Sequence, residues 1–241
     1  MSDAGVLLAV RGLDVHIGES HILQNVSFDV RAGGITGLLG RNGVGKTTTL
    51  RGILGLAPRT GSVMLAGEEL TRLQVHQVVQ RGVGYVPEDR DVFAGLTVAE
   101  NLRLAERAGN TLRYDLVYEL FPELQQRAAQ KAGTLSGGQQ QMVSLARALL
   151  NSDNRILLVD EPTKGLAPLV VRNVTDALRR ASQVATILLV EQNLSVAHAL
   201  VRDVIVLDQG QVSFTGDVSE LMDDPALARK YLGLAAAVGS H

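Results

Sequence analysis

The chain has 241 residues, a length that suits one α/β domain with nested subdomains, and its formal net charge of −2 shows no basic excess of the kind that indicates nucleic acid as the main partner. It contains no cysteine, which excludes disulfides and thiolate metal sites and fits a reducing compartment such as the cytosol. Its start lacks a basic stretch before an apolar core, and no run of about 18 apolar residues could span a bilayer, so we expect any membrane role to depend on a partner.

The chain is predicted to begin with a β-hairpin. Apolar and polar residues partly alternate over 6–17 and again over 21–30, and 18–20 supplies turn residues between them. A short apolar run at 35–39 is followed by a glycine-rich loop and by helical spacing over 48–56. This second unit is expected to be a strand, a loop and a helix.

Two short strands and a helical insert are expected next. One strand is predicted at 63–65, and another is predicted to end with 84–87. Helix formers dominate 98–124, with Pro122 as a stop. The apolar residues placed on the buried stripes of this insert are Leu102, Ala105, Val117 and Leu120.

The second half alternates between helices and buried strands, which is typical of a parallel sheet covered by helices. In chain order we expect a helix at 137–150, a strand at 156–159, a helix at 169–181, a strand at 186–190, and a closing strand pair at 204–207 and 212–214. The small and polar residues 235–241 are expected to be frayed.

The glycine-rich loop at 40–47 fits the pattern G-x-x-x-x-G-K-[ST], a phosphate loop. Glycines let several backbone N–H groups converge on a triphosphate, the following helix directs its positive end toward it, Lys46 adds a cation, and Thr47 offers a hydroxyl to Mg²⁺. A chance glycine turn would match only on the order of a few times per thousand chains. The expected nucleotide-binding residues are Gly40, Arg41, Asn42, Gly43, Val44, Gly45, Lys46, Thr47 and Thr48.

A pair of carboxylates, Asp160 and Glu161, ends the buried strand run at 156–159. Two acids that follow a strand usually form a solvated turn. With a phosphate loop upstream in the same α/β sheet, however, Asp160 is expected to hold Mg²⁺ and Glu161 to polarise the attacking water.

A second glycine-rich segment, Leu135-Ser136-Gly137-Gly138-Gln139, precedes the helix at 137–150. Ser136 and Gln139 can form a capping box, so the segment could simply start that helix. Two glycines in a first turn nevertheless cost about 1 kcal/mol each against alanine. They make sense if a phosphate approaches bare backbone there.

With these motifs the whole chain resembles the ABC ATPase family. The resemblance implies an α/β P-loop NTPase with a RecA-like parallel sheet core, an antiparallel β subdomain and a helical insert, forming a single domain over 1–241 with a nested helical subdomain at about 89–150. It further implies a head-to-tail dimer that holds two ATP molecules between its protomers. The segment Ser136, Gly137, Gly138 and Gln139, called the signature below, would then cover the γ-phosphate bound by the opposite subunit.

Several positions depart from the family pattern. The family normally has glutamine where this chain has Glu88, and we keep Glu88 as a metal contact. Where a histidine is usual, Gln192 could donate to the γ-phosphate without titrating near neutral pH. Ile17 occupies the place of the aromatic residue that stacks on adenine, so adenine is expected to contact either an aliphatic face or the ring of His16, which is more often only a strand residue. The usual acidic loop is altered at 164–168.

Three segments, at 86–88, 165–168 and 190–193, resemble the ATP-binding subunits of branched-chain amino-acid importers. Two others, at 139–141 and 20–23, are more similar to relatives that serve urea or short amides. Either resemblance implies ATP and Mg²⁺, a second ATPase subunit, transmembrane permease subunits, indirectly a solute-binding protein, and a cytoplasmic place on the inner face of the membrane.

Two other classes of protein compete with an importer subunit. Soluble ABC ATPases of DNA repair, translation or iron–sulfur assembly tend to carry tandem cassettes, coiled-coil insertions, zinc ligands or basic arms, which this sequence lacks. A purely regulatory nucleotide site is disfavoured because Lys46 and Glu161 are both retained.

Overall fold

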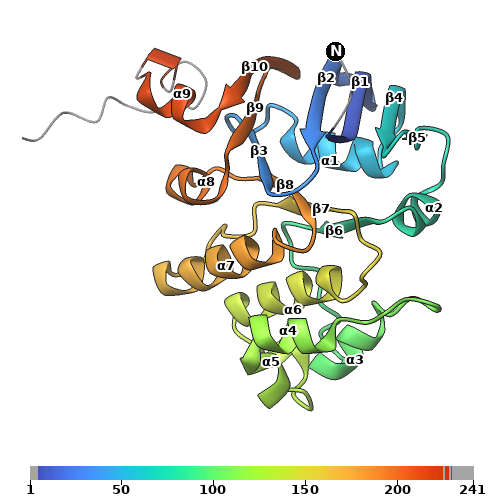
Figure 1. Ribbon diagram of the computed structural model, residues 1–241, viewed down its shortest axis with the longest axis vertical. Helices are drawn as coiled ribbons and strands as arrows, with labels where there is room; N and C mark the ends of the chain where they lie inside the picture. The colour runs from blue at the N-terminus through green and yellow to red at the C-terminus, as the bar shows by residue number, and fades with distance from the viewer. Residues whose placement is uncertain (1–4, 225, 228, 230–241) are drawn as a thin grey trace, which may run out of the picture.

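The computed structural model describes residues 5–224, 226, 227 and 229, so the tail expected to fray, at 235–241, lies outside the described residues. Two sheets organise these residues (Figure 1). A four-stranded antiparallel sheet has the order β2-β1-β4-β5, and a six-stranded sheet has the order β10-β9-β3-β8-β7-β6.

The predicted β-hairpin is confirmed. Strand β1 (Val6–Ile17) pairs antiparallel with β2 (Ser20–Arg31). On its other edge β1 pairs with β4 (Arg59–Leu65), which extends farther than the strand expected at 63–65, and β4 pairs with β5 (Glu68–Glu69).

The six-stranded sheet is parallel except for its closing pair. Its strands are β3 (Ile35–Leu39), β6 (Val83–Val86), β7 (Ile156–Asp160), β8 (Thr186–Val190), β9 (Asp203–Asp208) and β10 (Gln211–Asp217). Strand β3 lies between β8 and β9, and β7 lies between β8 and β6, all in parallel pairs, whereas β9 and β10 are antiparallel. The carboxyl ends of β3, β6, β7 and β8 therefore share one sheet edge, where α/β proteins bind their ligands.

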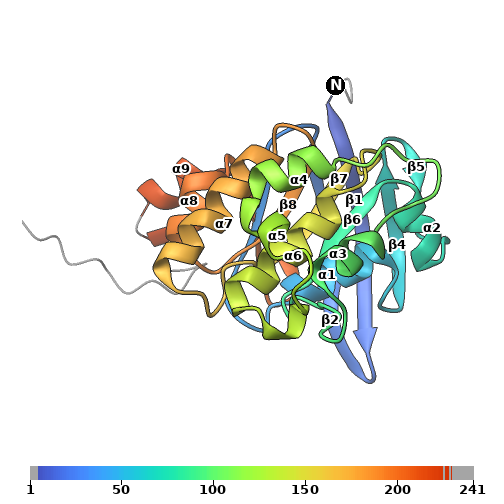
Figure 2. The same cartoon turned by 90° about the horizontal axis from the view of Figure 1, so that it is seen from below.

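Each central strand serves two hydrophobic cores because successive side chains point to opposite faces. In β7, Ile156 and Leu158 join the core between the two sheets, which also contains Leu50 and Ile53 of α1. Leu157 and Val159 face the other core, which is formed with the helical layer. The antiparallel sheet and α1 thus cover one face of the parallel sheet, and helices cover the other (Figures 1 and 2).

The described helices are α1 (Lys46–Leu54), α2 (Val75–Gln80), α3 (Val98–Arg103), α4 (Tyr114–Leu120), α5 (Pro122–Gln126), α6 (Gly137–Leu149), α7 (Pro168–Ala181), α8 (Leu194–Leu200) and α9 (Val218–Asp223), with a 3-10 turn at Ala132–Thr134. Helices α2, α8 and α9, each one or two turns long, were not predicted from the sequence. Helix α1 begins two residues before the predicted 48–56. Among the described residues, no helix has the length and apolarity to cross a bilayer.

The expected helical insert consists of three short helices, of which α3 and α5 pack against α6 and α4 packs against α5. Its predicted buried residues Leu102 and Val117 are fully buried, whereas Ala105 and Leu120 are half-buried. The prediction that Pro122 stops a helix is confirmed for α4, which ends at Leu120 with a non-helical Phe121 before the proline. Pro122 occupies the first position of α5, where its missing N–H costs nothing and its fixed φ suits a helix start.

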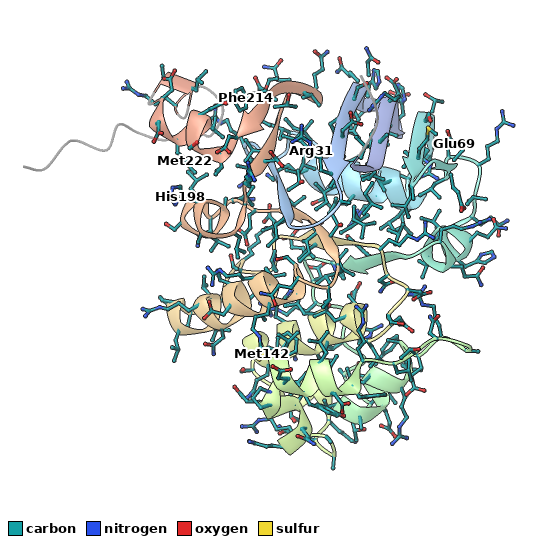
Figure 3. The ribbon with its side chains drawn as sticks, viewed as in Figure 1. Arg31, Glu69, Met142, His198, Phe214 and Met222 are labelled. Atoms are coloured by element: carbon teal, nitrogen blue, oxygen red, sulfur yellow. The ribbon has the colours of Figure 1, made fainter. Side chains whose placement is uncertain are left out.

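Helix α6 joins the insert to the parallel sheet. Its buried side chains Met142, Leu145 and Leu149 belong to the core on the helical side of that sheet, and Met142 is labelled in Figure 3. Because α6 also begins at the signature, the packing of this helix determines where the signature lies.

Candidate functional site

The phosphate loop lies between β3 and α1, as the sequence predicted. Gly40, Gly43 and Gly45 have φ values of 143°, 78° and 104°, a region that L side chains rarely adopt. A Cβ on Gly40 would lie 2.4 Å from the carbonyl oxygen of Leu207. Glycine is therefore required to curl the loop beside β9, while Arg41, Asn42 and Gly43 form its exposed part.

Lys46 is the cation of this loop. Its buried Nζ donates hydrogen bonds to the carbonyl oxygens of Gly40 and Arg41, each at 3.0 Å. Burial lowers the pKa of Lys46, and the negative charges of Glu161 and Asp160 oppose that shift. The ammonium group therefore lies inside the curl that would surround a phosphate, next to the two strand-end carboxylates.

Thr47 and Asp160 meet at the sheet edge. The Thr47 hydroxyl donates to Oδ1 of Asp160 across 3.1 Å, while Oδ2 of this fully buried carboxylate has no hydrogen-bond partner. Burial raises the pKa of Asp160 to about 6, a shift that the Thr47 hydrogen bond opposes and that nearby Glu161 and Glu88 increase. An unpaired buried carboxylate oxygen beside a hydroxyl is a donor set that fits Mg²⁺.

Glu161 is only 7% exposed, and polar groups surround its carboxylate. Oε1 lies 3.8 Å from Lys46 Nζ and accepts a hydrogen bond from Gln192 Nε2. Oε2 lies 3.4 Å from Lys164 Nζ. The two residues predicted as catalytic, Glu161 and Gln192, are thus brought together, and the amide of Gln192 is directed at Glu161 in this structure.

Glu88 follows β6 at the same edge. Its Oε1 accepts a hydrogen bond from Lys164 Nζ. Lys164 was not predicted as a site residue. The loop at 164–168 departs from the family pattern, but no local sequence pattern pairs Lys164 with Glu88, which lies 76 positions away.

Glu191 is a further buried carboxylate beside the site, and it was not predicted as a site residue. It accepts hydrogen bonds from the Thr163 hydroxyl at 2.6 Å and from the backbone N–H groups of Gln192 and Asn193, each at 3.0 Å. Burial raises the pKa of Glu191, and these hydrogen bonds oppose the shift. Glu191 therefore joins the loop after β7 to the loop after β8 and fixes the backbone that carries Gln192.

The signature forms the predicted capping box. The Ser136 hydroxyl accepts from the backbone N–H of Gln139 at 3.3 Å, and Gln139 Oε1 accepts from the backbone N–H of Ser136 at 3.0 Å. Ser136 is exposed, and within the described part of the chain residues 136–139 make no hydrogen bond or ion pair with 40–48.

The structure also supplies an internal reason for the paired glycines. A Cβ on Gly138 would lie 2.3 Å from Cγ1 of Val170 in α7, and a Cβ on Gly137 would lie 2.9 Å from the Arg90 guanidinium. Gly138 therefore lets α6 and α7 approach each other, so access for a phosphate is not the sole explanation for both glycines.

Comparison with known proteins finds relatives that match most of this chain. A family model described as "ABC transporter" matches residues 23–164. This chain belongs to the ABC transporter family. The high-affinity branched-chain amino acid transport ATP-binding protein BraG of Pseudomonas aeruginosa is 36% identical over 234 residues, which are 94% of this chain and 100% of BraG. The probable branched-chain amino acid transport ATP-binding protein LivF of Archaeoglobus fulgidus is 39% identical over 223 residues, 90% of this chain and 94% of LivF.

A solved structure shares the fold of this ABC subunit. The crystal structure of a nucleotide-free ATP-binding cassette from an ABC transporter superposes with a TM-score of 0.81 at 23% identity, covering 95% of this chain and 99% of that one. The predicted fold class, the resemblance and the assignment as an ATP-binding and ATP-hydrolysing subunit are therefore confirmed.

The two residues considered for adenine point to opposite faces of β1 in this ABC subunit. Val15 is buried against Gly52 of α1, and Ile17 at the end of the strand is 52% exposed. His16 lies on the face opposite to Ile17, where its ring stacks on His21 with centroids 4.0 Å apart.

Proposed function

We propose that this ABC ATPase powers an importer of branched-chain amino acids. The observation that carries the proposal is the 36% and 39% identity to BraG and LivF over nearly the whole chain. The segments at 86–88, 165–168 and 190–193 are consistent with it, and none of the relatives described above favours the urea or short-amide alternative.

In the proposed mechanism, the amides of 40–48 and the Lys46 ammonium bind the phosphates of ATP. Glu161 accepts the proton of the attacking water, and Gln192 contacts the γ-phosphate once it releases Glu161. Thr47, Asp160 and Glu88 would hold Mg²⁺, which supplies positive charge against the phosphates when bound. Ile17 offers adenine an aliphatic face.

A second ATPase subunit completes the site in this proposal. Among the described residues, exposed Ser136 and the start of α6 make no hydrogen bond or ion pair with the phosphate loop of their own chain, which supports contact with nucleotide bound by a partner. ATP binding would close the dimer and hydrolysis would reopen it. We place the dimer on the cytoplasmic face of the membrane, with residues 1–241 acting as one domain and about 89–150 as its helical subdomain.

A groove of about 380 Å³ supports contact between the helical subdomain and a permease. It lies between β6, the segment that follows α3 and helix α6, and its lining includes Tyr85, Pro87, Arg147 and exposed Leu104. An exposed leucine beside a concave surface is a common feature of protein interfaces.

Reconstitution with a candidate permease pair and solute-binding protein tests the substrate. ATP-dependent uptake of leucine, absent from vesicles without this subunit, is the expected result. Uptake of urea without uptake of leucine would replace the proposal with its alternative.

The permease contact is tested separately with Leu104→Asp and with Val184→Asp as a matched exposed control. Leu104→Asp is expected to reduce co-purification with the permease at least about tenfold, because a buried unpaired charge costs several kcal/mol. Equal retention of the permease by both variants would contradict the proposed groove.

A further inference from the structure

One exposed lysine bridges two strands at the hydrolysis site. Lys164 follows β7 and Glu88 follows β6, yet the Lys164 ammonium donates to Oε1 of Glu88 and lies 3.4 Å from Oε2 of Glu161. The side chain of Lys164 is 56% exposed, whereas those of Glu88 and Glu161 are 33% and 7% exposed. The buried carboxylate and the half-buried one therefore share one cation that solvent can reach.

The charge balance of the site makes this contact important. Glu88 and Glu161 both lie close enough to Asp160 to raise its pKa, and a triphosphate would add further negative charge beside these three carboxylates. Lys46 is engaged by the carbonyl oxygens of its own loop. Lys164 is the cation that directly neutralises Glu88 among the described residues.

The two carboxylate oxygens of Glu161 have different partners. Oε1 faces Lys46 and Gln192, while Oε2 faces Lys164. Removal of Lys164 would free Oε2 to rotate and would leave Glu88 as an unpaired negative charge. Rotation of the Glu161 carboxylate would disturb the attacking water, and the unpaired charge of Glu88 would repel the phosphates of the nucleotide.

We propose that Lys164 is a positioning residue for ATP hydrolysis, which pairs with Glu88 as one neutral unit and holds Glu161 by its second oxygen. The proposal rests on the assignment of Glu161 as general base. An exposed ion pair contributes little to stability on average, so the effect is expected in nucleotide binding and turnover rather than in folding.

The test is a double-mutant cycle with Lys164→Ala, Glu88→Gln and the combined variant, together with Lys164→Arg and the distant control Lys131→Ala. Turnover and KM for ATP are measured with Mg²⁺, and binding of a fluorescent ATP analogue is measured without it. Lys164→Ala is expected to weaken metal-free nucleotide binding by about three- to tenfold and to lower kcat by about tenfold.

Adding Glu88→Gln to Lys164→Ala should restore metal-free binding to within about twofold of wild type, because it removes the charge that Lys164 neutralised. Lys164→Arg should retain most activity, and Lys131→Ala should match wild type. If the losses of nucleotide binding from Lys164→Ala and Glu88→Gln are strictly additive in the double variant, the two residues do not act as a pair and the proposal is wrong.

Failure of the inference is distinguishable from failure of the general-base assignment. If Glu161→Gln keeps full turnover while positions 88 and 164 still couple in metal-free binding, the base assignment fails and the pairing stands. If Glu161→Gln loses turnover but positions 88 and 164 do not couple, the inference alone fails.

Discussion

The hydroxyl of Thr47 donates to Oδ1 of Asp160 across 3.1 Å, joining the first turn of α1 to the last residue of β7. The other oxygen of Asp160 is buried without a partner. This hydrogen bond links the phosphate loop to the strand-end carboxylates. Because the carboxylate of Asp160 is buried with one oxygen unpaired, burying its charge should have a measurable free-energy cost.

Asp160→Asn should stabilise the nucleotide-free protein in a pH-dependent way. Since burial raises the pKa of Asp160 from 3.8 to about 6, the folded protein binds this proton more tightly than the unfolded chain does. The ionised carboxylate therefore lowers the free energy of unfolding as pH rises from about 4 to about 6, and the full cost is present above that range.

Denaturant unfolding at several pH values checks this prediction. The stability difference between Asp160→Asn and wild type should grow from near zero at about pH 4 to roughly 1–3 kcal/mol above about pH 6. The exposed Asp176→Asn serves as control. A difference that stays constant with pH would contradict the raised pKa.

Glu161→Gln should cut ATP turnover by about 10² to 10⁴ while leaving ATP bound and the dimer closed. The amide oxygen that replaces Oε1 can still accept from Gln192, whereas the negative charge that faces Lys46 and Lys164 is lost together with the base. Single-turnover hydrolysis and nucleotide retention on gel filtration measure the two parts, with exposed Glu119→Gln as control. Turnover equal to wild type would refute the assignment of the base.

Lys46→Ala should weaken ATP binding itself by about ten- to a hundredfold, because the bound phosphates lose a buried counter-ion. Titration calorimetry with a non-hydrolysable ATP analogue measures the affinity directly. Wild-type affinity in this variant would show that the phosphates do not contact the curl around Lys46.

Gly138→Ala should destabilise the fold, whereas Gly137→Ala should be tolerated. The new Cβ at position 138 would meet Val170 Cγ1 at 2.3 Å, which we expect to cost about 1–3 kcal/mol. At position 137 it would meet the end of the flexible Arg90 side chain, which can move away.

Thermal and denaturant unfolding of both alanine variants measures this contrast. Val170→Ala should recover much of the loss in the Gly138→Ala background because it removes the clashing methyl groups. Equal stability of Gly138→Ala and wild type would mean that α6 and α7 are packed less tightly than the structure shows.

Much of this site could be predicted from the sequence because its motifs are local. The phosphate loop needs glycines, a lysine and a threonine within eight positions, so its pattern predicts Lys46 and Thr47. The acids Asp160 and Glu161 are predicted from the strand that they follow together with the phosphate loop upstream. The capping box of Ser136 and Gln139 is local in the same way.

What only the tertiary structure decided depends on segments that are distant in sequence. The carboxyl ends of β6 and β7 bring Glu88 to Lys164, and helix packing places Val170 over Gly138. Strand alternation directs Ile17 and His16 to opposite faces of β1. No sequence spacing specifies such contacts, because they follow from strand order and helix packing, which form only when the whole chain folds.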